Sequence, residues 1–129
     1  PLVLAGDLNL IDRPFAGGRY ADADAHGYRA LLDRLHLADA WREHDRRAAG
    51  FTFDPATNPY AARGRCRHIP GQRIDYVLYR PHAGLRCPQA ALVFTEAPHL
   101  SDHYGVLADL LLPPKISASS AGGVTSSWS

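Results

Sequence analysis

Apolar and polar residues follow two different rhythms along the first third of the chain. Residues 1–6 are nearly all apolar and predict a buried strand. Apolar side chains then recur every three or four positions across residues 28–38, which is typical of an amphipathic helix. Asp24 is the expected N-cap of that helix. Residues 12–27, which lie between the two elements, are expected to form a loop.

The rest of the chain shows short apolar stretches separated by turn-forming residues. Residues 40–50 are polar and end in Gly, so a loop is expected there. A D-P-A-T-N-P turn and later prolines bound four predicted strands, at residues 51–53, 73–81, 90–98 and 104–113. One strand, one helix and four further strands predict an α/β fold, with a single sheet that carries the helix on one face.

Length and composition limit the class of protein. The chain has 129 residues, of which 46% are hydrophobic, so it is one small domain or a piece of a larger one. Residues 115–129 are rich in Ser, Gly and Ala without periodicity and are expected to be disordered, which leaves residues 1–114 as the folded part. No apolar run is long enough to span a bilayer.

Charge and cysteine content narrow the class further. The formal net charge of +1 gives no strong nucleic-acid signal, because nucleic-acid binders usually carry a basic stripe. The exception is a basic segment with arginines at positions 63, 65, 67 and 73. Cys66 and Cys87 have neither zinc-site nor redox-motif spacing, so a disulfide and two free thiols are both open interpretations.

Three short segments carry the candidate chemistry: G-D-L-N at 6–9, R-I-D-Y at 73–76 and S-D-H at 101–103. Asp7 and Asn9 end the first strand two positions apart, so their side chains point to the same side. Asp75 lies within an apolar strand, where a carboxylate needs a partner, and the imidazole of His103 needs an orienting acid. An isolated Asp or Ser-Asp pair is usually a surface or turn residue, but together these segments predict a contact between Asp75 and His103.

In this order, the three segments resemble the C-terminal half of the endonuclease/exonuclease/phosphatase superfamily, the deoxyribonuclease I-like hydrolases. Gly105 stands where the family's S-D-H-x-P-V element usually has Pro. The resemblance implies a four-layer αββα sandwich, of which residues 1–114 would form the C-terminal portion. The N-terminal half of such a domain brings a metal-binding Glu, an Asn and a second His, and we expect that half to be the missing partner of this chain. The chain alone would then hold half an active site and be inactive.

The resemblance also implies a role for each matched residue. Asp7 would orient or deprotonate the attacking water, and Asn9 would hydrogen-bond the phosphate or help to fix that water. His103, oriented by Asp75, would stabilise the pentacovalent phosphorus. Asp102 and His103 would serve the metal site. Hard oxygen ligands favour Mg²⁺, with Mn²⁺ or Ca²⁺ as substitutes.

Residues 52–59, T-F-D-P-A-T-N-P, are similar to the T-(F/W)-D-P-x-x-N segment of neutral sphingomyelinases. The resulting prediction is a metal-dependent phosphodiester hydrolase that cleaves sphingomyelin to ceramide and phosphocholine. Another phosphodiesterase, nuclease or phosphatase of the same fold is one alternative, and a non-catalytic fragment that docks a partner polypeptide on its exposed sheet face is another. The arginines at 63, 65 and 67 are interpreted as a solvated loop or, alternatively, as a contact for phosphate or for anionic head groups at a membrane surface.

Overall fold

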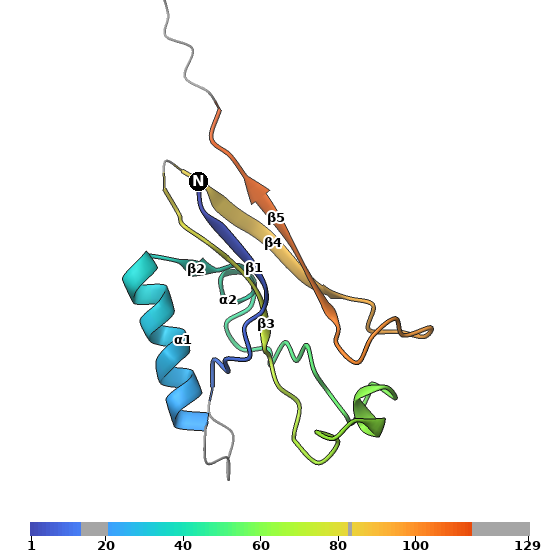
Figure 1. The fold of residues 1–129 in the computed structure, drawn as a ribbon. Helices are drawn as coiled ribbons and strands as arrows, with labels where there is room; N and C mark the ends of the chain where they lie inside the picture. Colours follow the sequence, from blue (N-terminus) through green and yellow to red (C-terminus); the bar gives the residue numbers. More distant parts are fainter. Residues whose placement is uncertain (14–20, 83, 115–129) are drawn as a thin grey trace, which may run out of the picture.

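The computed structural model describes residues 1–13, 21–82 and 84–114. In this part of the chain, a long helix and a short helix pack with two antiparallel sheets (Figure 1). None of the helices described is long and apolar enough to cross a membrane. The tail that the sequence predicts to be disordered, residues 115–129, lies outside the described residues.

The first sheet contains three strands in the order β1, β3, β2, each antiparallel to its neighbour. β1 (Val3–Asp7) and β3 (Asp75–Tyr79) confirm two predicted strands, whereas β2 (Ala38–Asp39) is too short to leave a pattern in the sequence. Across the β1–β3 pair, Asp7 lies directly opposite Asp75. Two of the predicted site carboxylates therefore start from neighbouring positions on one sheet.

Helix α1 (Ala21–Leu35) covers one face of this sheet (Figure 1). The helix begins before Asp24, so the predictions of an Asp24 N-cap and of a loop up to residue 27 are wrong. The A-D-A-D-A sequence at 21–25 explains the longer helix, because Ala favours helices and Asp is favourable near a helix N-terminus. The core between helix and sheet contains Tyr28, Leu37, Tyr76 and Leu78, with Leu4, Leu31 and Leu32 packed against it.

Helix α2 (Ala40–His44) contacts the opposite side of the first sheet. The prediction of a loop over residues 40–50 is therefore wrong for its first part. Asp39 accounts for the helix, because its Oδ1 accepts hydrogen bonds from the backbone N–H groups of Trp41 and Arg42, at 3.0 and 3.3 Å. The core on this side contains Ala40, Tyr79, Leu85, Cys87 and Ala90.

The second sheet is a hairpin of β4 (Arg86–Val93) and β5 (Gly105–Leu111). The prediction of a single sheet is therefore wrong, because the strand after His103 belongs to the second sheet. β5 pairs with the strand that precedes it in the chain, which is the commonest arrangement for consecutive strands. β4 also ends earlier than predicted, because Phe94, with φ = +62°, leaves the extended conformation after Val93.

Residues 51–53 form a link between other segments instead of the predicted strand. Phe53 makes an isolated antiparallel bridge with Gln72 on one side and with His103 on the other. Because neighbouring strands lie about 4.8 Å apart, these bridges bring the residues before β3 and before β5 within two strand spacings of each other. The candidate site is built around this link.

Candidate active site

The G-D-L-N segment at the end of β1 uses two uncommon backbone conformations. Gly6 has φ = +139° and Asn9 has φ = +50°, values that Gly adopts freely and that Asn tolerates better than most residues. The backbone N–H of Asn9 donates a hydrogen bond to Oδ1 of Asp7, at 2.9 Å. This bond fixes the orientation of the Asp7 carboxylate, which is exposed at the end of the strand.

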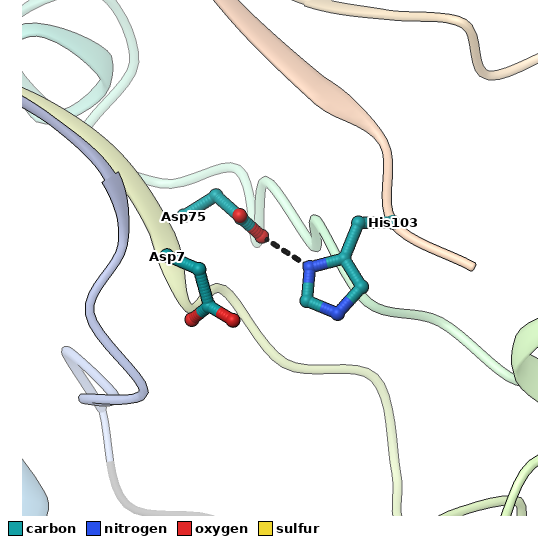
Figure 2. Close-up of side chains that lie close together, drawn as sticks. All are labelled: Asp7, Asp75 and His103. Atoms are coloured by element: carbon teal, nitrogen blue, oxygen red, sulfur yellow. Dashed lines mark hydrogen bonds and ion pairs between the residues drawn. The ribbon is translucent and has the colours of Figure 1, made fainter. Parts of the chain in front are cut away.

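Asp7 and Asp75, from neighbouring strands, meet His103 from the segment before β5 (Figure 2). Nδ1 of His103 lies 2.8 Å from Oδ2 of Asp75, so the contact predicted from the sequence is present. One ligand atom from each of the three residues lies within 4.8 Å of the other two. This set is hereafter the Asp7–Asp75–His103 group. Its members are half-buried or exposed, so solvent and small ligands can reach them.

The hydrogen bond to Asp75 orients the imidazole of His103. A carboxylate only accepts hydrogen bonds, so Nδ1 carries the proton in this bond and Nε2 faces away from Asp75 (Figure 2). The ring of Phe53 packs edge-on against the imidazole, with ring centroids 5.5 Å apart and planes at 64°. A ring held in this way presents Nε2 to a ligand in a defined direction.

A cavity of about 200 Å³ opens beside His103. Its walls are formed by Asn9, Phe53, Gly64, Arg65, Cys66, Ile74, Asp102 and His103. Asn9 and Asp102, the other two residues predicted for the site, therefore line the same cavity as His103, whereas Asp7 and Asp75 are grouped directly with its imidazole. Cys66 and Cys87 are both free thiols, so the disulfide alternative is wrong, and Cys66 is exposed on this wall.

The S-D-H segment at 101–103 is fastened by Asn58, a residue that carried no site prediction. Asn58 is only 1% exposed, and its Nδ2 donates a hydrogen bond to the carbonyl of Ser101, at 3.0 Å. The Ser101 hydroxyl accepts from the backbone N–H of His103 at 3.1 Å and donates to Asp102 at 3.2 Å. The signal in the sequence was the T-F-D-P-x-x-N segment, but the partner of its Asn lies 43 residues away.

The donor atoms of the site suit a divalent metal ion. The Asp7–Asp75–His103 group offers two carboxylates and an imidazole, and the cavity wall adds the amide of Asn9 and the carboxylate of Asp102. Such a set, rich in hard oxygen donors, favours Mg²⁺, Mn²⁺ or Ca²⁺. Asp102, predicted as a metal ligand together with His103, lies outside the closest group among the described residues. The metal and catalytic roles of these residues stay predictions.

A second set of charged side chains surrounds Arg73, where the segment before β3 meets α1 and β2. Nη2 of Arg73 lies 2.6 Å from Oδ2 of Asp39 and 2.9 Å from Oδ2 of Asp12, and the Arg73 side chain is 1% exposed. Arg42 pairs with the same Asp12 carboxylate, and the hydroxyl of Tyr28 donates to Asp39. These five residues are hereafter the Arg73 network. Arg73 therefore does not share the exposed environment of the other arginines in its basic segment.

Burial and pairing change the ionisation of this network. Burial alone would lower the pKa of Arg73, but its hydrogen bond to Asp39 and the charges of Asp39 and Asp12 raise that pKa, so the guanidinium stays charged. Burial, and then the charge of Asp39, raises the pKa of Tyr28. Burial likewise raises the pKa of Tyr76, which packs against Tyr28 with ring centroids 5.2 Å apart. Both tyrosines are therefore held in the neutral form.

Comparison with known proteins relates the chain to a family and to a solved structure. The Endonuclease/Exonuclease/phosphatase family matches residues 1–103. The chain is also similar to the structure of the 3′ phosphatase NExo from Neisseria bound to product DNA hairpin, with 24% sequence identity and a TM-score of 0.59. That match covers 84% of this chain and 44% of the other, so this chain spans less than half the length of the similar structure. No curated protein sequence matches the chain.

Proposed function

Because the chain belongs to the endonuclease/exonuclease/phosphatase family, we propose that it provides the His103 side of the active site in a metal-dependent phosphodiester hydrolase. Members of this family are hydrolases, and the predicted α/β class is confirmed as part of that fold. The observation that carries the proposal is the 2.8 Å contact between His103 and Asp75, with Asp7 in the same group. An oriented imidazole beside two carboxylates offers a hydrogen-bond donor and a base in one place, and hydrolysis of a phosphodiester needs both.

In the proposed reaction, a water molecule attacks phosphorus while the bond between phosphorus and the leaving oxygen breaks. Asp7 accepts a proton from the water, because its carboxylate is exposed and oriented by the main chain of Asn9. His103 donates from Nε2 to a phosphate oxygen as negative charge builds up there, and Asp75 stabilises the positive imidazolium. The leaving oxygen takes up a proton from solvent in the open cavity.

The same part of the chain would hold the divalent ion that the family generally uses. The described residues offer four candidate oxygen ligands, Asp7, Asn9, Asp75 and Asp102. His103 would bind the ion only with Nε2 deprotonated, and not while Nε2 donates to the phosphate. When bound, Mg²⁺, or Mn²⁺ or Ca²⁺ in its place, supplies positive charge at the substrate phosphate. Two hydrogen bonds, from His103 to Asp75 and from the N–H of Asn9 to Asp7, keep these donors close together.

We further propose that a polypeptide segment outside these 129 residues completes the site, as the N-terminal half of the same domain. The similar structure supports this, because the match covers only 44% of it. Exposed apolar side chains on the two sheets give further support. Val3 of β1 is 47% exposed and Leu107 of β5 is 55% exposed, and apolar sheet surface of this kind is suited to packing against another sheet. The isolated chain is then expected to be inactive.

For the substrate we propose sphingomyelin, cleaved to ceramide and phosphocholine. Support comes from residues 52–58, whose T-F-D-P-x-x-N pattern is similar to that of neutral sphingomyelinases. Asp54 of this pattern accepts a hydrogen bond from the hydroxyl of Thr57 within a turn, and Asn58 fastens Ser101 beside the cavity. The pattern thus shapes the segment that carries His103, where it influences which substrate fits.

A phosphate ester of a nucleic acid is the second candidate. Arg65 lies on the cavity wall, in a basic run with Arg63, Arg67 and His68 that contains no acidic residue. A guanidinium at this place suits a second phosphate of a nucleic acid as well as the phosphate of a lipid head group. The similar Neisseria protein is described as a 3′ phosphatase bound to product DNA, and this favours the nucleic-acid alternative.

An assay of the complete protein that contains this chain distinguishes the two candidates. The substrates are sphingomyelin vesicles, lysophosphatidylcholine, a DNA hairpin with a 3′ phosphate, abasic DNA and inositol phosphates, each with and without EDTA. We expect turnover of sphingomyelin that EDTA abolishes and Mg²⁺ restores. Turnover of DNA alone would contradict the sphingomyelin proposal, and turnover that is indifferent to EDTA would contradict the metal dependence. His103→Ala protein is the control for a contaminating activity.

A further inference from the structure

One buried threonine links the two segments that carry Asp75 and His103. Thr52 is fully buried, with an exposed fraction of 0%. Its hydroxyl oxygen accepts hydrogen bonds from the backbone N–H groups of Ile74 and Asp75, each 3.1 Å long. Its carbonyl oxygen accepts a hydrogen bond from the backbone N–H of Tyr104, the residue after His103, at 2.6 Å.

The hydroxyl of Thr52 holds an irregular stretch of backbone where β3 begins. In a regular strand, successive N–H groups point to opposite edges, so they do not share one acceptor. Here the N–H groups of Ile74 and Asp75 converge on a single oxygen. At this stretch Arg73 enters the buried network and Asp75 reaches His103, although Arg73 and Asp75 are only two positions apart and would share one side of a regular strand.

The main chain of Thr52 connects the segment before β3 with the segment of His103. Its N–H donates to the carbonyl of Gln72 at 2.9 Å, and the adjacent Phe53 bridges to both Gln72 and His103. Thr52 is not among the residues that line the cavity, so it does not contact a ligand there. Any effect of Thr52 on the reaction must therefore pass through the residues that it holds, which are Asp75 and Ile74 on one side and the segment of His103 on the other.

We propose that Thr52 is a positioning residue, whose hydroxyl sets the placement of Asp75 relative to His103. This inference rests on the proposed function, because the hydrolysis in which the pair acts is itself a proposal. Any residue would supply the main-chain bonds, but only a side chain with an oxygen at this position holds the two N–H groups of β3. Removal of that oxygen at constant shape therefore separates positioning from packing.

Thr52→Val and Thr52→Ser in the complete protein form the test pair. Val keeps the branched shape and loses the acceptor, whereas Ser keeps the oxygen. We expect Thr52→Val to lower kcat by up to about 10²-fold at nearly unchanged KM, because small misplacements at a reacting centre have effects of that order. Thr52→Ser is expected to retain most of the wild-type kcat. Thr95→Val, at an exposed threonine that does not line the cavity beside His103, is the control and should leave kcat unchanged.

A second readout does not depend on turnover. The proton between Nδ1 of His103 and Asp75 gives an imidazole resonance far downfield in the ¹H NMR spectrum, and its loss in His103→Ala identifies it. We expect this resonance to shift or broaden in Thr52→Val and to stay in place in Thr52→Ser and Thr95→Val. If it behaves in this way in a protein that hydrolyses none of the substrates, the proposed function fails and the placement of the pair by Thr52 stands.

Three results would overturn the inference. In the first, Thr52→Val leaves both kcat and the downfield resonance unchanged. In the second, Thr52→Ser is as impaired as Thr52→Val, which would assign the effect to packing. The third applies if Thr52→Val does not fold. Thr52→Cys, whose thiol is a weaker acceptor of similar size, then takes its place. A wild-type kcat and an unchanged resonance in Thr52→Cys would contradict the positioning role.

Discussion

The Arg73 network and the Asp7–Asp75–His103 group are joined by one short stretch of backbone, residues 73–75. The network contains two guanidinium groups and two carboxylates, so its charges balance, and the Arg73 side chain is 1% exposed. The group contains two carboxylates and one imidazole, and the side chains of His103 and Asp75 are 25% and 20% exposed. Its charges do not balance, and water reaches it.

This difference separates charges that hold the fold together from charges that are available for chemistry. A buried and balanced set is stable only when complete, because removal of one partner leaves a buried charge unpaired. Two carboxylates in one accessible place instead favour a ligand that brings positive charge, such as a divalent metal ion. Residue type alone does not distinguish the two cases, since Arg73 and Asp75 belong to the same R-I-D-Y motif.

The largest expected effect is on catalysis by the accessible group. His103→Ala and Asp7→Ala in the complete protein are each expected to lower kcat by roughly 10²–10⁴-fold, because they remove electrostatic stabilisation or a base. Asp75→Asn is expected to have a milder or comparable effect, since it misorients His103. Circular dichroism should stay native in all three variants. A natively folded His103→Ala protein with full activity would show that the role of His103 is wrong.

The buried network predicts a large effect on stability instead. Arg73→Ala is expected to lower the free energy of unfolding by roughly 3–5 kcal/mol, because it leaves Asp39 buried without its cation. Urea unfolding followed by circular dichroism measures this loss. Arg63→Ala, at an exposed position, is the control and is expected to change stability by less than about 0.5 kcal/mol. If Arg73→Ala and Arg63→Ala were equally stable, the conclusion that the buried charges hold the fold together would be wrong.

Alkaline pH is expected to lower the free energy of unfolding by a smaller amount, which grows as the pH rises. Burial raises the pKa of Tyr28, with a further contribution from the charge of Asp39, and burial raises the pKa of Tyr76. In the unfolded chain both tyrosines titrate near the usual value of about 10. Above about pH 10 the unfolded state therefore loses protons that the folded state keeps, and stability falls by up to about 1.4 kcal/mol per pH unit for each tyrosine. Below that pH the two tyrosines do not change the free energy of unfolding as the pH varies.

Urea unfolding at a series of pH values from about 8 to 11 measures this slope. Tyr28→Phe is the matched variant, because it removes the Tyr28 hydroxyl and its hydrogen bond to Asp39. It leaves Tyr76, Tyr79 and Cys87, whose pKa values burial also raises. Its stability is expected to be lower at neutral pH but to fall less steeply above about pH 10. The same slope in Tyr28→Phe and in the wild type would show that Tyr28 is not held neutral by the fold.

The smallest expected effect concerns Arg65 on the cavity wall. Arg65→Ala is expected to raise KM several-fold, up to about tenfold, with little change in kcat, because an exposed guanidinium contributes modest binding energy to a phosphate. Arg63→Ala is the matched control, since Arg63 does not line that cavity. Steady-state kinetics at two salt concentrations measures the difference. A loss of kcat at constant KM would instead place Arg65 among the residues that stabilise the transition state.

The contact between Asp75 and His103 was predictable because each residue needs a partner and the order of the segments offered one. That Asn9 and Asp102 line one cavity with His103 was predictable from the resemblance of the three segments to the family. The Arg73 network was not predictable in this way. In the sequence, Arg73 looks like the neighbouring exposed arginines, and only the packing of Tyr28 and Asp39 around it decides that it is buried.

The errors in the fold also have physical causes. Helix α2 is a single short turn of chain that depends on one capping side chain, Asp39, so it has no periodic pattern of its own. The alternation in residues 104–113 fits a strand in either sheet, because the pattern fixes which side chains share a face and not which strand is the neighbour. Helix α1 begins earlier than predicted. Its first turn contains Ala and Asp and has no apolar stripe, so the periodicity of the sequence did not reveal it.

The thiol of Cys66 makes the cavity accessible to site-specific labelling. Cys87 is buried, and burial raises the pKa of its thiol, so a thiol-reactive fluorophore added to the folded chain should attach to the exposed Cys66 first. A dye at that position sits on the same wall as Asn9, Asp102 and His103. Its emission would then follow the arrival of a metal ion or a phosphate ester in real time, and binding could be titrated before any substrate is identified.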